Sequence, residues 1–429
     1  MSDRWNVRPL AQDFVTVFES PDPQAVYCYS PGLARLDRGR LVATMDLGGP
    51  GVERLAGAKF CRTPGGPAWQ GRVMTSDDRG RSWAFRSHFP FMHARPFAAG
   101  DALYVLGQAG DLMIMRSDDL GQTWGEPAAL TAGQVWHQAP CNVHYANGSV
   151  YLVMERRITR DIRGWHVGEI APVLMRGRLD ADLTRRDNWT FASELSFRDV
   201  VPNVETDPAL DFFGVPFFPC PYPGGSLPAP GRGCNPIGWL ETNVVQIADP
   251  DHVWFDPAGR TFHLWARAHT GGTGFACIAK VVENPDGSMT TGLETAPSGK
   301  TVLYVPCPGG QMKFHVLQDP PTGLYWLLST QATDSMTRAD RLPPDRYNLP
   351  NNQRRRLQLH FSKNMIDWCF AGLVAVGPVE HGSRHYASMV IDGDDLHVFS
   401  RSGDERAKSA HDGDLLTFHT VRDFRRLVY

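Results

Sequence analysis

Two short stretches decide the fold: Thr75-Ser-Asp-Asp-Arg-Gly-Arg-Ser-Trp83 and Arg116-Ser-Asp-Asp-Leu-Gly-Gln-Thr-Trp124. Both read Ser-x-Asp-x-Gly-x-Ser/Thr-Trp, and they begin about 40 residues apart, a spacing typical of repeat folds. The pattern predicts a hairpin turn in which the Asp side chain bonds the turn backbone, Gly adopts a positive φ and Trp packs between sheets. We therefore expect Asp78 and Asp119 to be structural residues.

Short runs of alternating hydrophobicity surround these turns and predict β-strands. They occupy residues 102–106, 149–154, 261–265, 324–328 and 395–399, and each follows a turn that contains Gly. Grouping them predicts six units, at about 27–87, 88–133, 134–200, 239–295, 310–375 and 383–424. The run Phe14–Phe18 is expected to complete the last sheet and to close the ring. The prediction is an all-β fold: a six-bladed β-propeller of four-stranded antiparallel sheets, forming one domain over residues 1–429.

Residues 201–238 interrupt the repeat. This segment is rich in Pro and Gly, which predicts a long loop. A long loop on a rigid scaffold is usually functional. Cys220 and Cys234 bracket part of it and are candidates for a disulfide or a metal site. The eight cysteines are scattered without a Cys-x-x-Cys motif, which favours free thiols instead.

Composition excludes several classes of protein. With 42% hydrophobic and 21% charged residues among 429, the chain can bury a large core, which excludes a disordered protein. The 43 Lys and Arg nearly balance 46 Asp and Glu, and the longest basic run is Arg354–Arg356, so no nucleic-acid partner is expected. No apolar stretch is long enough for a membrane helix.

The N-terminal residues lack a signal-peptide pattern, which predicts a cytoplasmic protein, or a secreted or periplasmic one if a leader was removed. The 15 His show no zinc-ligand spacing, so no metal and no cofactor are expected.

The repeated turns resemble those of the sialidase (neuraminidase) superfamily. Trp239-Leu-Glu-Thr-Asn-Val-Val245, followed by Thr261-Phe-His-Leu-Trp-Ala-Arg267, is similar to that family's blade carrying Glu and then Arg. The resemblance implies that Glu241 activates a Tyr nucleophile and that Arg267 is the second Arg of a clamp on the substrate carboxylate. A neutral phenol suits an anionic substrate better than a second carboxylate would.

Two further stretches extend this resemblance. Arg354-Arg-Arg-Leu-Gln-Leu-His-Phe-Ser362 is similar to the segment with the third Arg, which implies Arg354. His385-Tyr-Ala-Ser-Met-Val-Ile-Asp-Gly393 is similar to the segment with the nucleophile, which implies Tyr386. The first clamp Arg is replaced, because Ser30 stands where the family has Arg-Ile-Pro. Asp46 is the nearest candidate for the family's catalytic acid.

A second resemblance competes with the first. Trp136–Val143, Gln311–Pro320 and His411–Phe424 resemble bacterial sialidase-like propellers. That group is related to lyases and rhamnosidases acting on rhamnose–glucuronate linkages. In such lyases, His and Tyr serve as base and acid while an Arg neutralises the uronate, which implies His93, His137 or Tyr386 as the base.

Polar residues at the starts of the predicted inner strands identify a candidate site, because these starts surround one mouth of a propeller channel. The candidates for catalysis are Tyr386, Glu241, His137 and Asp46. The candidates for substrate binding are Arg267, Arg354, His93, Arg95, Lys313, His315 and His385. The first hypothesis is a glycoside hydrolase that removes a terminal acidic sugar from a glycan. The alternatives are a lyase for rhamnosyl-glucuronate-type linkages and a non-catalytic glycan-binding propeller.

Overall fold

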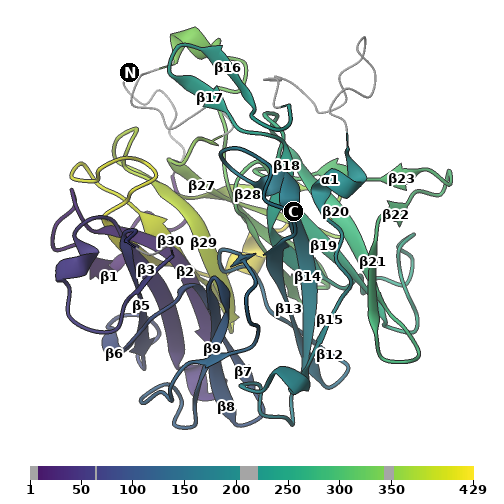
Figure 1. Ribbon diagram of the computed structural model, residues 1–429, viewed down its shortest axis with the longest axis horizontal. Coiled ribbons are helices and arrows are strands. Elements are labelled where there is room, and N and C mark those ends of the chain that lie inside the picture. Colours follow the sequence, from purple (N-terminus) through teal and green to yellow (C-terminus); the bar gives the residue numbers. More distant parts are fainter. Residues whose placement is uncertain (1–7, 63–64, 203–220, 343–351) are drawn as a thin grey trace.

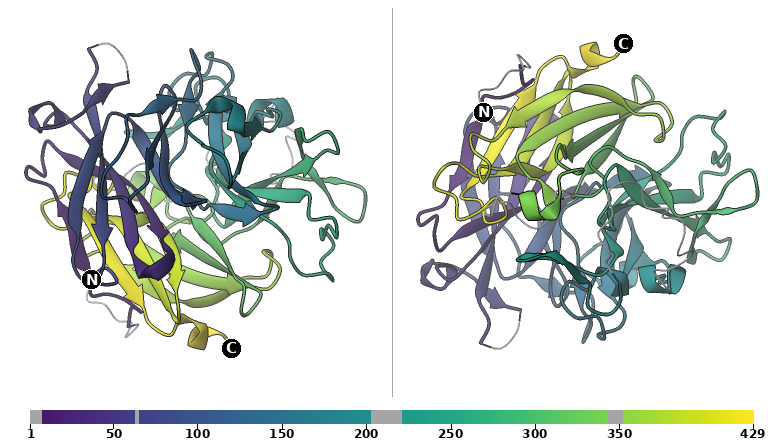
Figure 2. Two further views of the ribbon diagram at one scale, coloured as in Figure 1. Left: turned by 90° about the horizontal axis from the view of Figure 1, so that it is seen from below. Right: turned by 90° about the horizontal axis from the view of Figure 1, so that it is seen from above.

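The computed structural model describes residues 8–62, 65–202, 221–342 and 352–429. Six antiparallel sheets, seen from the side in Figure 1, are arranged in a ring around a central channel. Figure 2 shows them following one another around the ring in chain order, with the C-terminal strands (yellow) beside the N-terminal ones (purple). The predicted six-bladed β-propeller is confirmed.

Each blade has four principal strands. The innermost strands are β2 (Tyr27–Arg35), β7 (Met92–Ala99), β11 (Trp136–His137), β18 (Gly238–Val245), β25 (His315–Asp319) and β29 (Arg384–Asp392). The second strands are β3 (Leu41–Gly48), β8 (Ala102–Ala109), β13 (Ser149–Arg157), β19 (Thr261–His269), β26 (Leu324–Thr330) and β30 (Asp395–Ser402). The third strands are β5 (Ala68–Ser76), β9 (Asp111–Ser117), β14 (Ile170–Arg178), β20 (Phe275–Glu283), β27 (Arg356–Ser362) and β31 (Leu415–Val421). The outer strands are β6 (Ala84–Phe89), β10 (Ala128–Ala129), β15 (Trp189–Phe191), β21 (Met289–Gly292), β28 (Cys369–Val376) and β1 (Val15–Glu19).

Shorter strands and helices lie outside the four principal strands of each blade. The extra strands are β4 (Phe60–Cys61), β12 (His144–Ala146) and β24 (Tyr304–Pro306), and the two small hairpins are β16 (Ser226–Ala229) with β17 (Arg232–Cys234) and β22 (Glu294–Thr295) with β23 (Thr301–Val302). The helix α1 spans Phe197–Val200, and the 3-10 helices are η1 (Asp37–Gly39), η2 (Val52–Arg54), η3 (Val167–Glu169), η4 (Arg186–Asn188), η5 (Ala339–Arg341) and η7 (Phe424–Leu427).

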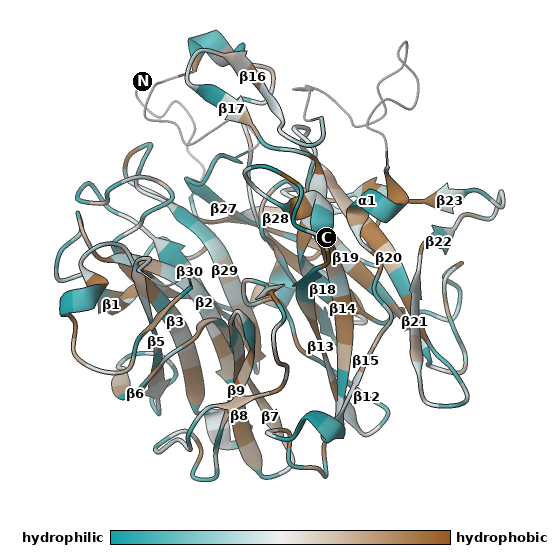
Figure 3. Cartoon of the chain, in the orientation of Figure 1, coloured by the Kyte–Doolittle hydropathy of each residue, from teal (hydrophilic) through white to brown (hydrophobic). Residues whose placement is uncertain are grey.

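The ring closes through its two chain ends, as expected. β1 pairs antiparallel with β31, so that Val15 lies opposite Phe418 and the last blade takes its outer strand from the N-terminal segment. This pairing leaves the N-terminal strand hydrogen-bonded within the last sheet rather than unpaired. Apolar residues concentrate on the strands (Figure 3), and the buried clusters lie between neighbouring blades.

The Asp-containing turns are built as the sequence predicts. The Ser82 hydroxyl donates to the Asp78 carboxylate at 2.6 Å, and the Gly80 N–H donates to Ser76 Oγ at 2.8 Å. Gly80 has a φ of +85°, and the Trp83 ring packs on the ring of Phe418 with centroids 5.4 Å apart. The Asp78 carboxylate is therefore hydrogen-bonded within its own turn, which is a structural role.

The predicted loop at 201–238 is described only in part, since residues 203–220 lie outside the described residues. Its described portion carries the β16–β17 hairpin, which rises at the upper end of Figure 1. Cys234 is disulfide-bonded, so the expectation of free thiols is wrong for this residue, whereas Cys28, Cys61, Cys141, Cys277, Cys307 and Cys369 are free; Cys220 lies outside the described residues. No helix among the described residues is long and apolar enough to cross a membrane.

Candidate active site

A cavity of about 380 Å³ occupies one end of the channel, where the inner strands begin. All six blades contribute to its wall. The lining side chains include Tyr29, Ser30, Arg62, Trp69, Met92, His93, His137, Ala139, Trp165, Asn235, Glu241, Arg267, His269, Asn352, Arg354, Tyr386, Arg401 and His411. The predicted candidates His93, His137, Glu241, Arg267, Arg354 and Tyr386 are thus brought together.

Four inner strands aim a side chain at this cavity by the same backbone device. Ser30, His93, Glu241 and Tyr386 have φ values of 51°, 56°, 58° and 52°, and each lies at a register shift between the first and second strands of its blade. A left-handed conformation is uncommon for residues other than Gly, and a β-bulge redirects the side chain that it carries. Four equivalent bulges therefore turn four side chains toward one mouth.

Buried carboxylates on second strands support two of the bulges. Asp46 Oδ2 accepts the His93 N–H at 2.7 Å, and Glu155 Oε1 accepts the Thr242 N–H at 3.1 Å. Burial raises the pKa of Asp46 to about 7, although the bonds from His93 and from the Ser30 side chain oppose this shift. Asp46 is fully buried and does not line the cavity. The structure therefore places it behind the bulges and not where a catalytic acid would meet substrate.

The Tyr386 hydroxyl and the Glu241 carboxylate meet at one nitrogen of Arg267. Arg267 Nη1 donates to the Tyr386 hydroxyl at 2.9 Å and to Glu241 Oε2 at 3.2 Å. All three groups are largely shielded from water. Burial, together with the charge of Glu241 and its hydrogen bond to the Tyr386 hydroxyl, raises the pKa of Tyr386 to about 12. The phenol is therefore protonated at neutral pH, with a carboxylate in place to receive its proton.

Two more guanidinium groups flank Tyr386. The Cζ atoms of Arg354 and Arg401 each lie 5.3 Å from the centroid of its ring. Asn352 Oδ1 accepts from both Arg267 and Arg354, at 3.3 and 3.4 Å, which holds these two side chains together. His385 stands behind Arg354, since its Nδ1 lies 2.9 Å from Arg354 Nη1, and it does not line the cavity.

Two histidines form the opposite wall. The rings of His93 and His137 have centroids 5.0 Å apart, and the Trp165 ring lies 5.3 Å from that of His137. Burial lowers the pKa of His137 to about 4 and places the pKa of His93 well below its ordinary value. Both imidazoles are therefore neutral at neutral pH. The described residues contain no group of three or more His, Cys, Asp or Glu side chains that could hold a metal ion.

Besides His385, three more predicted substrate-binding residues do not line this cavity. Lys313 is buried beneath Tyr386, where its Nζ donates to the carbonyl oxygens of Tyr386 at 3.3 Å and Ala387 at 2.5 Å. Arg95 and His315 line a second cavity at the other end of the channel. Along an inner strand, residues only two or three positions past the bulge already lie deeper in the channel, which is why nearness in sequence to His93 did not bring Arg95 to the same mouth.

Arg401 was not predicted from the sequence, and neither were the lining residues Arg62, Trp69, Trp165, Asn235, Asn352 and His411. A signal for Arg401 exists: Asp395-Leu-His-Val-Phe-Ser-Arg401 repeats the pattern of Thr261-Phe-His-Leu-Trp-Ala-Arg267. Both segments are second strands, and their arginines lie opposite the residue that precedes the bulge, Leu240 for Arg267 and His385 for Arg401. Aligning the second strands would therefore have identified Arg401.

No protein-family model and no curated protein matches the sequence. Solved structures do match. A protein of unknown function from Dyadobacter fermentans is 12% identical with a TM-score of 0.52, over 96% of this chain and 98% of that one. The Hadza microbial sialidase Hz136 is 14% identical with a TM-score of 0.52, over 95% of this chain and 68% of that one. Trypanosoma rangeli sialidase, solved with sialic acid, is 13% identical with a TM-score of 0.50, over 98% of this chain and 60% of that one. The chain therefore has a sialidase-like propeller fold.

Proposed function

We propose that this protein is a glycoside hydrolase that removes a terminal acidic sugar from a glycan, with Tyr386 as the nucleophile and Glu241 as its base. One observation carries the proposal: Arg267 Nη1 bonds both the Tyr386 hydroxyl and the Glu241 carboxylate. A tyrosine attacks poorly as a neutral phenol, so it needs a partner that takes its proton as the bond to carbon forms. Glu241 is that partner.

The charges around the cavity support an acidic substrate. Among its described lining residues are four arginines, Arg62, Arg267, Arg354 and Arg401, and a single carboxylate, that of Glu241. Guanidinium groups bind carboxylates through paired, charge-assisted hydrogen bonds. We assign recognition of the sugar carboxylate to Arg354 and Arg401, because Arg267 is already engaged by the catalytic pair.

Protonation of the leaving oxygen is assigned to His137. It lies across the cavity from Tyr386, and it replaces Asp46, which does not reach the cavity. A pKa of about 4, set by burial, makes its imidazolium form a strong acid that becomes more populated as the pH falls. The sugar is thus held between a nucleophile on one wall and an acid on the other.

The test is hydrolysis of a panel of aryl glycosides of acidic sugars by the Tyr386→Phe variant. This variant keeps the ring and should lose turnover, whereas Tyr145→Phe, at the other end of the channel, should keep it. Wild-type activity in Tyr386→Phe contradicts the mechanism. Binding of acidic glycans by the wild-type protein without any turnover would favour the non-catalytic propeller.

A lyase acting on uronate linkages is the second candidate, favoured by the neutral imidazoles of His93 and His137. A neutral imidazole is able to remove the proton next to a uronate carboxylate that an Arg has neutralised. β-Elimination creates an unsaturated uronate with new ultraviolet absorbance, and hydrolysis does not. Following absorbance during digestion of a rhamnose–glucuronate polymer therefore separates the two reactions.

A further inference from the structure

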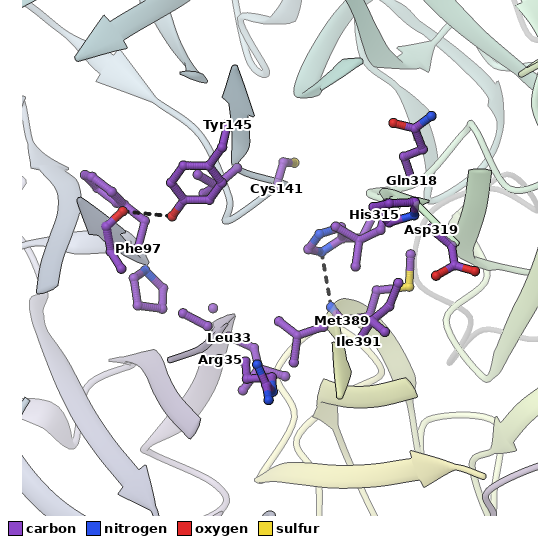
Figure 4. A pocket seen from close by; sticks show the side chains of 18 of the residues that line it. Leu33, Arg35, Phe97, Cys141, Tyr145, His315, Gln318, Asp319, Met389 and Ile391 are labelled. Atoms are coloured by element: carbon purple, nitrogen blue, oxygen red, sulfur yellow. Dashed lines mark hydrogen bonds between the residues drawn. The ribbon is translucent and has the colours of Figure 1, made fainter. Parts of the chain in front are cut away.

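A second cavity, of about 670 Å³, occupies the opposite end of the channel, where the inner strands end. Figure 4 shows its lining side chains, which come from the first, second, third, fifth and sixth blades. Apolar side chains make most of the wall: Leu33, Phe97, Val143, Leu317, Met389 and Ile391. The volume lies within the range of small-molecule sites, which are mostly apolar with a few placed polar groups.

His315 supplies one such polar group. Its Nδ1 accepts the Met389 N–H at 3.2 Å, so the ring hydrogen resides on Nε2. Nε2 has no acceptor among the described residues, although His315 is only 3% exposed. Figure 4 shows the imidazole reaching from β25 toward the centre of the cavity. A buried N–H without a partner costs free energy, which an acceptor on a ligand would recover.

Arg95 supplies the second polar group. Its two terminal nitrogens donate to the carbonyl oxygens of Asn142 and Val153, each at 3.2 Å, and its Nε has no acceptor in the part of the chain that the structure describes. Burial lowers the pKa of Arg95 to about 10, so it remains charged at neutral pH. Lys313 lies close enough to His315 to lower the pKa of that imidazole further, after burial itself. Arg95 therefore gives the floor of the cavity a positive charge, and the buried Lys313 lies nearby without lining the cavity.

No carboxylate among the described residues bonds Arg95 or Lys313, although burial lowers the pKa of both and the charges of Glu155 near Arg95 and of Glu241 near Lys313 partly oppose this lowering. Arg95 and Lys313 bond only backbone carbonyls and the Ser388 hydroxyl there. The lining carboxylates Asp319 and Asp394 both pair with Arg425, at 2.7 and 3.0 Å. One arginine thus balances one of these two negative charges, and neither carboxylate bonds Arg95, whose Nε has no acceptor among the described residues and is left to an anion from outside.

We propose that this second cavity binds a small monocarboxylate with an apolar body, its carboxylate on Arg95 and His315 and its body against the apolar wall. The carboxylate accepts the two hydrogens that lack acceptors, and the apolar wall removes the body from water. This site is separate from the candidate active site and does not depend on the proposed hydrolase reaction.

The test is calorimetric titration of the full chain with octanoate, octylamine and octanol, which share a tail and differ in charge. Octanoate should bind at one site, about tenfold or more tighter than either of the others, because only it matches the cationic floor. Equal binding of all three would overturn the anionic assignment. Lack of octanoate binding at millimolar concentration would overturn the site.

Paired variants locate the binding. Leu317 is half-buried in the wall, so both Leu317→Asp and Leu317→Asn place a polar group there at similar size. Leu317→Asp should weaken octanoate binding about tenfold relative to Leu317→Asn, since only the first adds a repelling charge. Equal affinities contradict the proposal.

Arg95→Lys keeps the positive charge but lacks Nε, so it should also weaken octanoate binding. If this variant fails to fold, the comparison of the two Leu317 variants decides. Octanoate should leave glycoside hydrolysis unchanged.

Discussion

The two ends of the channel are built from the same inner strands and differ in how those strands pair. At the ends where the strands begin, four strands contain a bulge with a left-handed residue, and charged groups face the cavity. At the ends where they finish, pairing is regular, as in Ser388 to Asp392 against Phe399 to Asp395, and most of the wall is apolar. Bulges thus place polar side chains where regular alternation would continue the apolar wall.

The bulged end also carries backbone strain. A left-handed residue other than Gly costs of order 1–3 kcal/mol, so four of them require support. Asp46 accepts the His93 N–H, Glu155 accepts the Thr242 N–H, and Lys313 donates to the carbonyl of Tyr386. Strain held by buried polar groups is typical of functional sites. The contrast favours the bulged end as the place of chemistry.

The largest expected effect is at Glu241. Glu241→Gln keeps the size of the side chain but removes the base for Tyr386, so turnover of aryl glycosides should fall roughly 10²–10⁴-fold. The matched control is Asp319→Asn at the other end, which should retain turnover because Asp319 pairs only with Arg425 and its own turn. Steady-state kinetics measures both. Near-normal turnover in Glu241→Gln would contradict the assignment of catalysis to the end of the channel with the bulges.

A smaller effect, of about 10–100-fold, is expected at Arg401. Arg401→Met removes one charge-assisted contact, so KM for acidic sugars should rise with little change for neutral sugars. Arg35→Met at the opposite mouth is the control and should change neither. Should both variants affect acidic and neutral substrates alike, Arg401 would be a structural residue only.

The pH dependence tests His137. Its pKa of about 4, lowered chiefly by burial, means that the protonated fraction grows about tenfold for each pH unit from 7 down toward 4. Hydrolysis of substrates with poor leaving groups should follow this increase, and His137→Asn should lose it. Substrates with good leaving groups need no acid and should be hydrolysed by His137→Asn at nearly the wild-type rate. The opposite selectivity would exclude His137 as the acid.

The last expected effect is on stability rather than on turnover, and it concerns Asp46. Burial raises the pKa of Asp46 to about 7, above its ordinary 3.8, so folding favours its protonated form. Its contribution is fully present below about pH 3.8 and is lost as pH rises through 7, a change of about 4 kcal/mol at most. Asp46→Asn keeps an acceptor for the His93 N–H and should flatten this slope in urea unfolding across pH 4–8. An unchanged slope would show that Asp46 stays ionised.

The sequence predicted the repeat and much of the site for a local reason. Turn residues and strand alternation are local patterns, so six units and ring closure followed from them, and Glu241, Arg267, Arg354 and Tyr386 followed from a resemblance. Asp46 and Arg95 were misplaced because the sequence does not reveal where a bulge shifts the register, and His315 was misplaced because its strand pairs without such a bulge. Arg401 was missed because its strand was read only as far as Phe399.

By itself, the sequence determined the class of the fold, the number of blades and the structural role of the Asp turns, since these depend on neighbours along the chain. Only the tertiary structure decided which polar residues share a cavity. Its bulges turn Ser30, His93, Glu241 and Tyr386 to one end, and on three of these four strands residues a few positions further along face the other end. That division depends on hydrogen bonds between distant segments, such as those from His93 to Asp46 and from Thr242 to Glu155, which no local pattern encodes.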